Sequence, residues 1–238
     1  MEEEVPSPLK LPSPHGTEAA SLQQEHIASD ITQIPCFGFQ GQLDKLEQLK
    51  KEIPNVHFLD QSANAANPEP EAHFTWTGTP EIWKDTAGKV DIFVAGSGTG
   101  ATVSGVGKYL KMKNPAVKVI CVEPAESPVI SGGKPSQHKI QGLGPGFVPK
   151  NLDTSVTDEL ITVTAEDAMV NARRLAKEEG LLVWHIIWSK SSSLPEGVAS
   201  REENKGKMIV TVFPSRGERY TNSDLFAAVR EECIAMTF

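Results

Sequence analysis

The stretch "DIFVAGSGTGATVSG", residues 91–105, decides the fold. An apolar run of strand-forming residues passes into three closely spaced glycines, and a helix-compatible segment follows. In α/β proteins such a turn holds a phosphate, because backbone N–H groups at a helix N-terminus face an anion that glycines allow to come close. The stretch therefore predicts an α/β fold with an anion-binding turn between a strand and a helix.

The rest of the chain repeats this alternation of strand and helix. Val- and Ile-rich segments predict the strands, and segments with helical spacing predict the helices. Thr164 is the expected N-cap of the second helix, and Gly180 is the expected glycine just after its end. Strands are predicted at 90–95, 117–122, 159–163 and 207–213, and helices at 101–112, 166–179 and 223–234. This order predicts a mostly parallel sheet with helices on both faces.

The flanking segments divide the chain into three parts. Residues 1–35 are rich in Pro, Ser, Glu and Gln, which is typical of a disordered leader. Residues 36–80 predict a remnant helix from Gln42, ended by Pro54, followed by a loop over 60–80. Residues 81–238 predict a partial α/β domain. Within it, residues 189–206 contain serines, Pro195 and Gly197 and would form a poor helix, so either a loop crosses over there or the sheet is interrupted.

Composition excludes several function classes. The chain has 238 residues and a net charge of −8, which argues against nucleic-acid and anionic-membrane partners. Its three cysteines show no metal-binding or disulfide spacing. The start, MEEEVPSPLK, resembles neither a signal peptide nor a transit peptide, and no apolar run would span a bilayer. A cytoplasmic protein without a bound metal is expected.

Taken by itself, the glycine run has two interpretations. Gly96, Gly98 and Ala101 match the G-x-G-x-x-G/A fingerprint of dinucleotide-binding domains, and Glu123 ends the next strand where an acid would bind a ribose. This pattern leaves open a nicotinamide-dinucleotide-binding domain. The other interpretation is a glycine turn that serves packing alone.

Longer strings resemble one enzyme family. "GTPEIWKDTAGKVDIFVAGSGTGATVSGVGKYLK", "VEPAESPVISGGKPSQHKIQGLGPGFVPKNLD" and "VFPSRGERY" look like the C-terminal half of a plant cysteine synthase, O-acetylserine (thiol)lyase. That family consists of fold-type II pyridoxal-phosphate enzymes. The resemblance implies that the chain keeps part of the large domain of that fold, with the small domain largely missing and an atypical N-terminus.

The resemblance also implies a cofactor site for pyridoxal 5'-phosphate. The family loop G-T-G-G-T, which wraps the cofactor phosphate, corresponds here to Gly98, Thr99, Gly100, Ala101 and Thr102. Ala101 replaces a glycine, which is a departure if that position needs a positive φ. Ser215 corresponds to the serine that hydrogen-bonds the pyridine nitrogen. Gln61 aligns with a family glutamine near the substrate, although Ser62 replaces the phenylalanine that follows it.

Two parts of the family's machinery are missing from the sequence. The S-x-K-D-R-like motif that carries the Schiff-base lysine does not occur, and neither does the T-S-G-N-T-G loop for the substrate carboxylate. Lys84-Asp85 belongs to a different family segment, so no catalytic residue is assigned.

The family reaction converts O-acetyl-L-serine and sulfide into L-cysteine and acetate. With these parts missing, we expect this chain to be inactive or crippled. The alternative is a non-catalytic partner of serine acetyltransferase, through its C-terminal tail, or of full-length cysteine synthase. A homodimer is also implied by the resemblance.

Overall fold

The structure is a computed structural model that describes residues 38–56, 60–68, 78–184 and 195–236. The chain forms two compact units, Met1–Val56 and His57–Phe238. In the first unit, α2 (Gly38–Glu52) ends just before Pro54, as the sequence predicts, but begins earlier than Gln42. The predicted leader, residues 1–35, lies outside the described residues.

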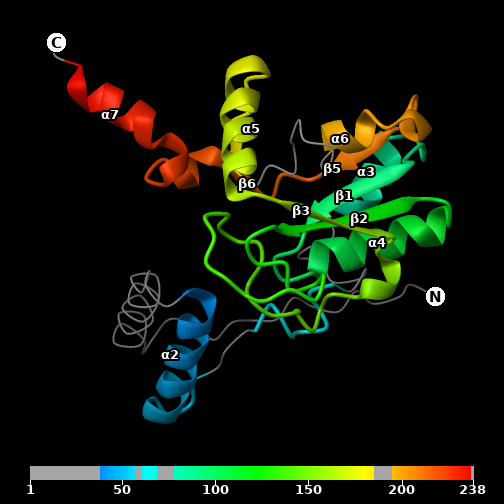
Figure 1. The fold of residues 1–238 in the computed structure, drawn as a ribbon. Helices are drawn as coiled ribbons and strands as arrows, with labels where there is room; N and C mark the ends of the chain where they lie inside the picture. Colours follow the sequence, from blue (N-terminus) through cyan, green and yellow to red (C-terminus); the bar gives the residue numbers. More distant parts are fainter. Residues whose placement is uncertain (1–37, 57–59, 69–77, 185–194, 237–238) are drawn as a thin grey trace, which may run out of the picture. The chain divides into compact units, whose positions relative to one another are not determined.

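The second unit is built on a four-stranded sheet (Figure 1). Its strands are β1 (Ile92–Gly96), β2 (Lys118–Pro124), β3 (Glu159–Val163) and β5 (Ile209–Thr211), in the order β3-β2-β1-β5. All three neighbouring pairs are parallel, with Val94 beside Ile120 and Thr211. The predicted α/β fold with a parallel sheet is confirmed. The last strand is shorter than the predicted 207–213, because its pairing with β1 stops at Thr211.

Most helices fall where the sequence predicts them. The α-helices of this unit are α3 (Gly78–Asp85), α4 (Ala101–Lys113), α5 (Ala165–Glu178), α6 (Pro195–Ala199) and α7 (Ala227–Ala235). Short 3-10 turns occupy Thr154–Val156, Glu202–Asn204, Gly217–Tyr220 and Asp224–Phe226. At α5 the Thr164 hydroxyl accepts from Asp167 N at 3.1 Å, and Gly180 follows with φ +69°. Both predicted ends of this helix are confirmed.

Two local predictions need correction, and one strand pair was not predicted. The helix α3 begins at Gly78, inside the stretch predicted as a loop. The crossover before β5 contains α6, whose Val198 is fully buried in the core, so it is not a loop throughout. The strand pair that the sequence did not predict is β4 (Val183–Trp184) with β6 (Ser215–Arg216), which is antiparallel. The apolar runs involved are too short to reveal their partners.

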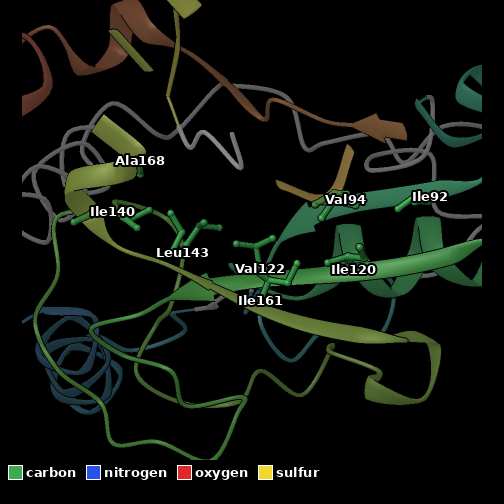
Figure 2. Packing of buried hydrophobic residues seen from close by; sticks show 11 residues of the cluster. Ile92, Val94, Ile120, Val122, Ile140, Leu143, Ile161 and Ala168 are labelled. Atoms are coloured by element: carbon green, nitrogen blue, oxygen red, sulfur yellow. The ribbon is translucent and has the colours of Figure 1, made fainter. Parts of the chain in front are cut away.

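The core lies on both faces of the sheet. Alternate residues of β1 point to opposite faces, so Ile92 and Val94 join one apolar cluster and Phe93 joins the other. The first cluster includes Val198 and residues of α5, and the second includes residues of α4. Figure 2 shows Ile140 and Leu143, from the loop after β2, in the first cluster near the end of the sheet. This packing fixes the 140–144 loop beside the turn that follows β1.

Candidate active site

The glycine turn joins the carboxyl end of β1 to the N-terminus of α4. Gly100 is the N-cap of α4 and has φ +83°, a left-handed conformation that costs other residues energy. Ala101 is the first residue inside the helix and does not share this positive φ. The alanine that replaces a family glycine therefore brings no conformational strain.

Packing alone explains why glycines occupy this turn. A Cβ on Gly98 would lie 2.4 Å from the carbonyl oxygen of Gly142, and one on Gly100 would lie 2.7 Å from Leu152 Cα. A Cβ on Gly96 would meet the Leu143 side chain at 2.7 Å. Glycine at positions 98 and 100 is thus required by the backbone of neighbouring loops, and the fingerprint does not by itself indicate a ligand.

The backbone donors of the turn do indicate an anion. Among the described residues, the N–H groups of Gly98, Thr99, Gly100 and Thr102 make no hydrogen bond, and that of Ala101 reaches only the Thr99 hydroxyl at 3.4 Å. Gly98, Thr99 and Thr102 are partly accessible to solvent. Unpaired donors at the positive end of a helix dipole suit a phosphate. The residues present here therefore fit the phosphate of pyridoxal 5'-phosphate.

A second loop is bonded to the start of this turn. Gly144 N donates to Ser97 O at 3.0 Å, and Ser97 N donates to Val122 O at 2.9 Å. The Gly144 carbonyl in turn lies 2.9 Å from His138 Nε2, which is the donor because a carbonyl only accepts. His138 thus braces the loop, and no described contact places it against a nucleophile. His185 lies outside the described residues.

Ser215 follows a strand that ends on the same side of the sheet as β1. It is the first residue of β6 and follows β5, which is the parallel neighbour of β1. The chain therefore leaves both strands at their carboxyl ends, where ligands of open α/β sheets bind. Ser215 is partly buried and lies opposite Trp184 in β4. That it contacts the cofactor stays a prediction.

The segment 60–67 is bonded to Asn151 and, through Asn67 Nδ2 and the Thr99 hydroxyl at 3.4 Å, to the glycine turn. Gln61 is exposed, and its backbone carbonyl accepts from Asn151 Nδ2 at 2.8 Å. Ser62 is only 8% exposed, so the smaller residue at this position is packed inside. The sequence gives no signal for Asn151, because a single asparagine in a loop matches no motif. Gln61 as a substrate residue stays a prediction.

The buried carboxylate of Glu123 is hydrogen-bonded to backbone N–H groups of the protein itself. Glu123 is 1% exposed, and its carboxylate accepts from the backbone of Ile130 at 2.8 Å and of Ser131 at 2.9 Å. On the same strand, burial raises the pKa of the Cys121 thiol to about 12, with the Glu123 charge adding to the effect and a bond to Ser97 opposing it. The acid that a dinucleotide fingerprint needs for its ribose is thus committed to a turn, which counts against the nicotinamide interpretation.

The described part of this unit has no fully buried lysine. Every described lysine of residues 60–68, 78–184 and 195–236 is at least partly exposed, including Lys84 on α3. Lys111 and Lys118 are the partly buried ones, and they pair with Asp158 at 2.7 Å and Glu159 at 2.6 Å. Lys118 and Glu159 begin β2 and β3, so this pair lies at the sheet edge opposite the glycine turn.

The described parts of the chain contain no group of three or more His, Cys, Asp or Glu side chains placed to hold a metal ion. None of their helices is both long and apolar enough to cross a bilayer.

The chain is similar in sequence to known pyridoxal-phosphate enzymes. Residues 27–185 match the family described as pyridoxal-phosphate dependent enzyme. Cysteine synthase 3 of Caenorhabditis elegans is 43% identical over 230 residues, which are 97% of this chain and 67% of that protein. A cysteine synthase of Staphylococcus aureus is 40% identical over 219 residues, 91% of this chain and 68% of that protein.

A solved structure shares the fold as well. The O-acetylserine sulfhydrylase isoform 3 of Entamoeba histolytica superposes with a TM-score of 0.68 at 41% identity. The match covers 79% of this chain but 55% of that one. The chain thus spans about two thirds of the length of these curated relatives and little more than half of the solved one.

Proposed function

This chain belongs to the pyridoxal-phosphate-dependent enzyme family, where its relatives are cysteine synthases, and from that premise we propose that it binds pyridoxal 5'-phosphate without a covalent bond. The observation that carries the proposal is a set of N–H groups at the start of α4 that find no partner among the described residues, those of Gly98, Thr99, Gly100 and Thr102. These donors and the helix dipole would hold the phosphate dianion.

Each residue of the proposed site has a separate task. The N–H groups of the turn and the Thr99 and Thr102 hydroxyls bind the phosphate. Ser215, in β6, which follows the β5 strand that pairs with β1, offers a neutral hydroxyl to the ring nitrogen. When bound, pyridoxal phosphate supplies an electron sink for β-replacement on an amino acid such as O-acetyl-L-serine.

We further propose that the chain does not carry out cysteine synthesis from O-acetyl-L-serine and sulfide at the rate of a complete enzyme. The reaction needs a lysine that bonds the cofactor and moves the substrate's α-proton. The sequence lacks the S-x-K-D-R-like motif, and the described lysines of the second unit are either exposed or, for Lys111 and Lys118, paired at the amino end of the strands. The chain would therefore bind the cofactor without converting O-acetyl-L-serine into cysteine.

The test combines a titration with chemical trapping. Pyridoxal phosphate is titrated into the purified chain and followed by absorbance, and the complex is then treated with borohydride and mapped by peptide mass spectrometry. We expect saturable binding with no single lysine labelled stoichiometrically, and no cysteine formed from O-acetyl-L-serine and sulfide. One lysine labelled in full, or absence of saturation, would refute the proposal.

A second candidate function is binding of an acidic peptide end. The same unpaired N–H groups that suit a phosphate would also accept a terminal carboxylate, such as that of the serine acetyltransferase tail. A tail peptide should then compete with pyridoxal phosphate, whereas the same peptide with a C-terminal amide should not. Equal competition by both peptides would exclude this mode.

The compartment and the assembly belong to the same proposal. We place the protein in the cytoplasm, since the two cysteines in the described ranges, Cys121 and Cys233, are free thiols. A homodimer is proposed from the relationship to cysteine synthases. Cell fractionation and sedimentation of the purified chain test these two statements.

A further inference from the structure

Asn151 is a buried side chain that joins three segments of the second unit. It is 7% exposed, and its Nδ2 donates to the carbonyl oxygens of Gln61 at 2.8 Å and Asn64 at 3.0 Å. Its backbone N–H donates to the carbonyl of Ser62 at 3.2 Å. One residue thus holds the turn formed by residues 60–64 at three backbone positions.

The same residue is bonded to the first turn of α4. The Ser104 hydroxyl donates to Asn151 O at 2.8 Å and accepts from Asp153 N at 2.7 Å. Ser104 is fully buried, so both of its bonds are shielded from water. The loop that carries Asn151 is therefore fixed to the helix whose N-terminus forms the proposed phosphate site.

The segment held by Asn151 also reaches the phosphate-binding turn. Asn67 Nδ2 donates to Gln61 O at 2.7 Å and to the Thr99 hydroxyl oxygen at 3.4 Å. Ala101 N approaches that hydroxyl oxygen at 3.4 Å as well. Because the Thr99 oxygen already accepts from two N–H groups, its own O–H is left to donate to another acceptor.

We propose that Asn151 is a positioning residue for the phosphate-binding turn, acting through the segment 60–67 and Asn67 to orient Thr99. It does not touch the cofactor, and the inference rests on the proposed binding of pyridoxal phosphate. An aspartate would fail in this position, because its carboxylate would oppose the carbonyl oxygens of Gln61 and Asn64 that Nδ2 now satisfies.

The chain offers a matched control for Asn151→Asp. Asn171 is 4% exposed and donates from Nδ2 to the Asp167 carbonyl at 2.6 Å, within α5. Asn171→Asp makes the same chemical change in a buried amide that has no bond to the turn. The probes are pyridoxine 5'-phosphate, which has no aldehyde to react with lysines, and phosphate-free pyridoxine.

The expected result is a loss specific to the phosphate. Asn151→Asp should weaken binding of pyridoxine 5'-phosphate by about tenfold or more and leave pyridoxine within about twofold, since one charge-bearing hydrogen bond is misdirected. Asn171→Asp should leave both affinities within about twofold. Equal changes in the two variants, or equal changes for the two ligands, would overturn the proposal.

Two further experiments test the positioning role if Asn151→Asp does not fold or if the unaltered chain binds no ligand. If Asn151→Asp does not fold, Asn67→Ala is compared with Asn64→Ala, and only the former should lower phosphate affinity; equal affinities overturn the inference. If the unaltered chain binds no pyridoxine 5'-phosphate, the proposed function fails. Hydrogen exchange of the free protein then decides the positioning role. Faster exchange in residues 98–103 is expected for Asn151→Asp but not for Asn171→Asp, and unchanged exchange overturns it.

Discussion

Gly100→Ala should destabilise the second unit by about 2–5 kcal/mol. The backbone at Gly100 has φ +83° and ψ −12°, a left-handed conformation that costs a residue with a Cβ roughly 1–2 kcal/mol. The new Cβ would lie 2.7 Å from Leu152 Cα and 2.8 Å from Leu152 N. These are backbone atoms that cannot rotate away, and overpacking of this kind costs about 1–3 kcal/mol.

Gly132→Ala separates the two contributions. Gly132 has φ +86°, almost the same conformation, but no atom lies within 4 Å of its added Cβ. It should therefore show only the conformational cost, about 1–2 kcal/mol. The change in unfolded-chain entropy from glycine to alanine is common to both variants and cancels in the difference.

The assay is urea unfolding of both variants and the unaltered chain, followed by far-UV circular dichroism, with free energies compared at equal m-values. Gly100→Ala should be less stable than Gly132→Ala by about 1–3 kcal/mol, and it alone should lose pyridoxine 5'-phosphate binding. If the two variants unfold at the same urea concentration, the close approach of the glycine turn to Leu152 is not what requires a glycine there.

Further predictions concern charges, thiols and a buried hydroxyl. The bidentate bond from Arg201 holds the pKa of Glu159 at about 2, below its ordinary 4.5. The stabilisation of the folded state by the ionised Glu159 is therefore complete above about pH 4.5 and is lost as the pH falls through 2. Arg201→Ala should cost roughly 1–3 kcal/mol at pH 7, and this cost should shrink when urea unfolding is repeated at lower pH. Cys233 is exposed and should react with a thiol reagent at once, whereas Cys121, fully buried and with a pKa raised to about 12, should react only on unfolding; prompt modification of both would contradict this. Ser104→Ala removes the partner of the buried Asn151 carbonyl and of the partly buried Asp153 N–H and should cost about 1–3 kcal/mol in urea unfolding, with a change below 0.5 kcal/mol counting against the bonds.

The sequence predicts the parallel sheet well because its information is local. Each of the strands β1, β2 and β3 is a Val- or Ile-rich run, and the caps of α5 are set by residues within one turn of its ends. The antiparallel pair of Val183 with Arg216 was not predictable, because two-residue strands carry no periodicity. Asn151 was missed for a related reason: its role depends on contacts with residues 47 to 90 positions away.

The glycines of the turn show where a motif stops carrying functional information. Gly98 and Gly100 are both required by the backbone atoms of neighbouring loops, so a domain that bound no ligand would need them equally. The dinucleotide and pyridoxal-phosphate interpretations share these glycines and therefore cannot be separated by them. The other polar groups near the turn separate the two interpretations. The Glu123 carboxylate already accepts hydrogen bonds from the turn at Ile130 and Ser131, so it is not available to a ribose. Four N–H groups of the glycine turn, in contrast, have no partner among the described residues. A bound phosphate would satisfy those donors at a helix N-terminus, and no ribose acid is needed for that. The chain thus presents the groups that we propose to hold a phosphate, while the lysine chemistry that would use the cofactor belongs to a motif that its sequence does not contain.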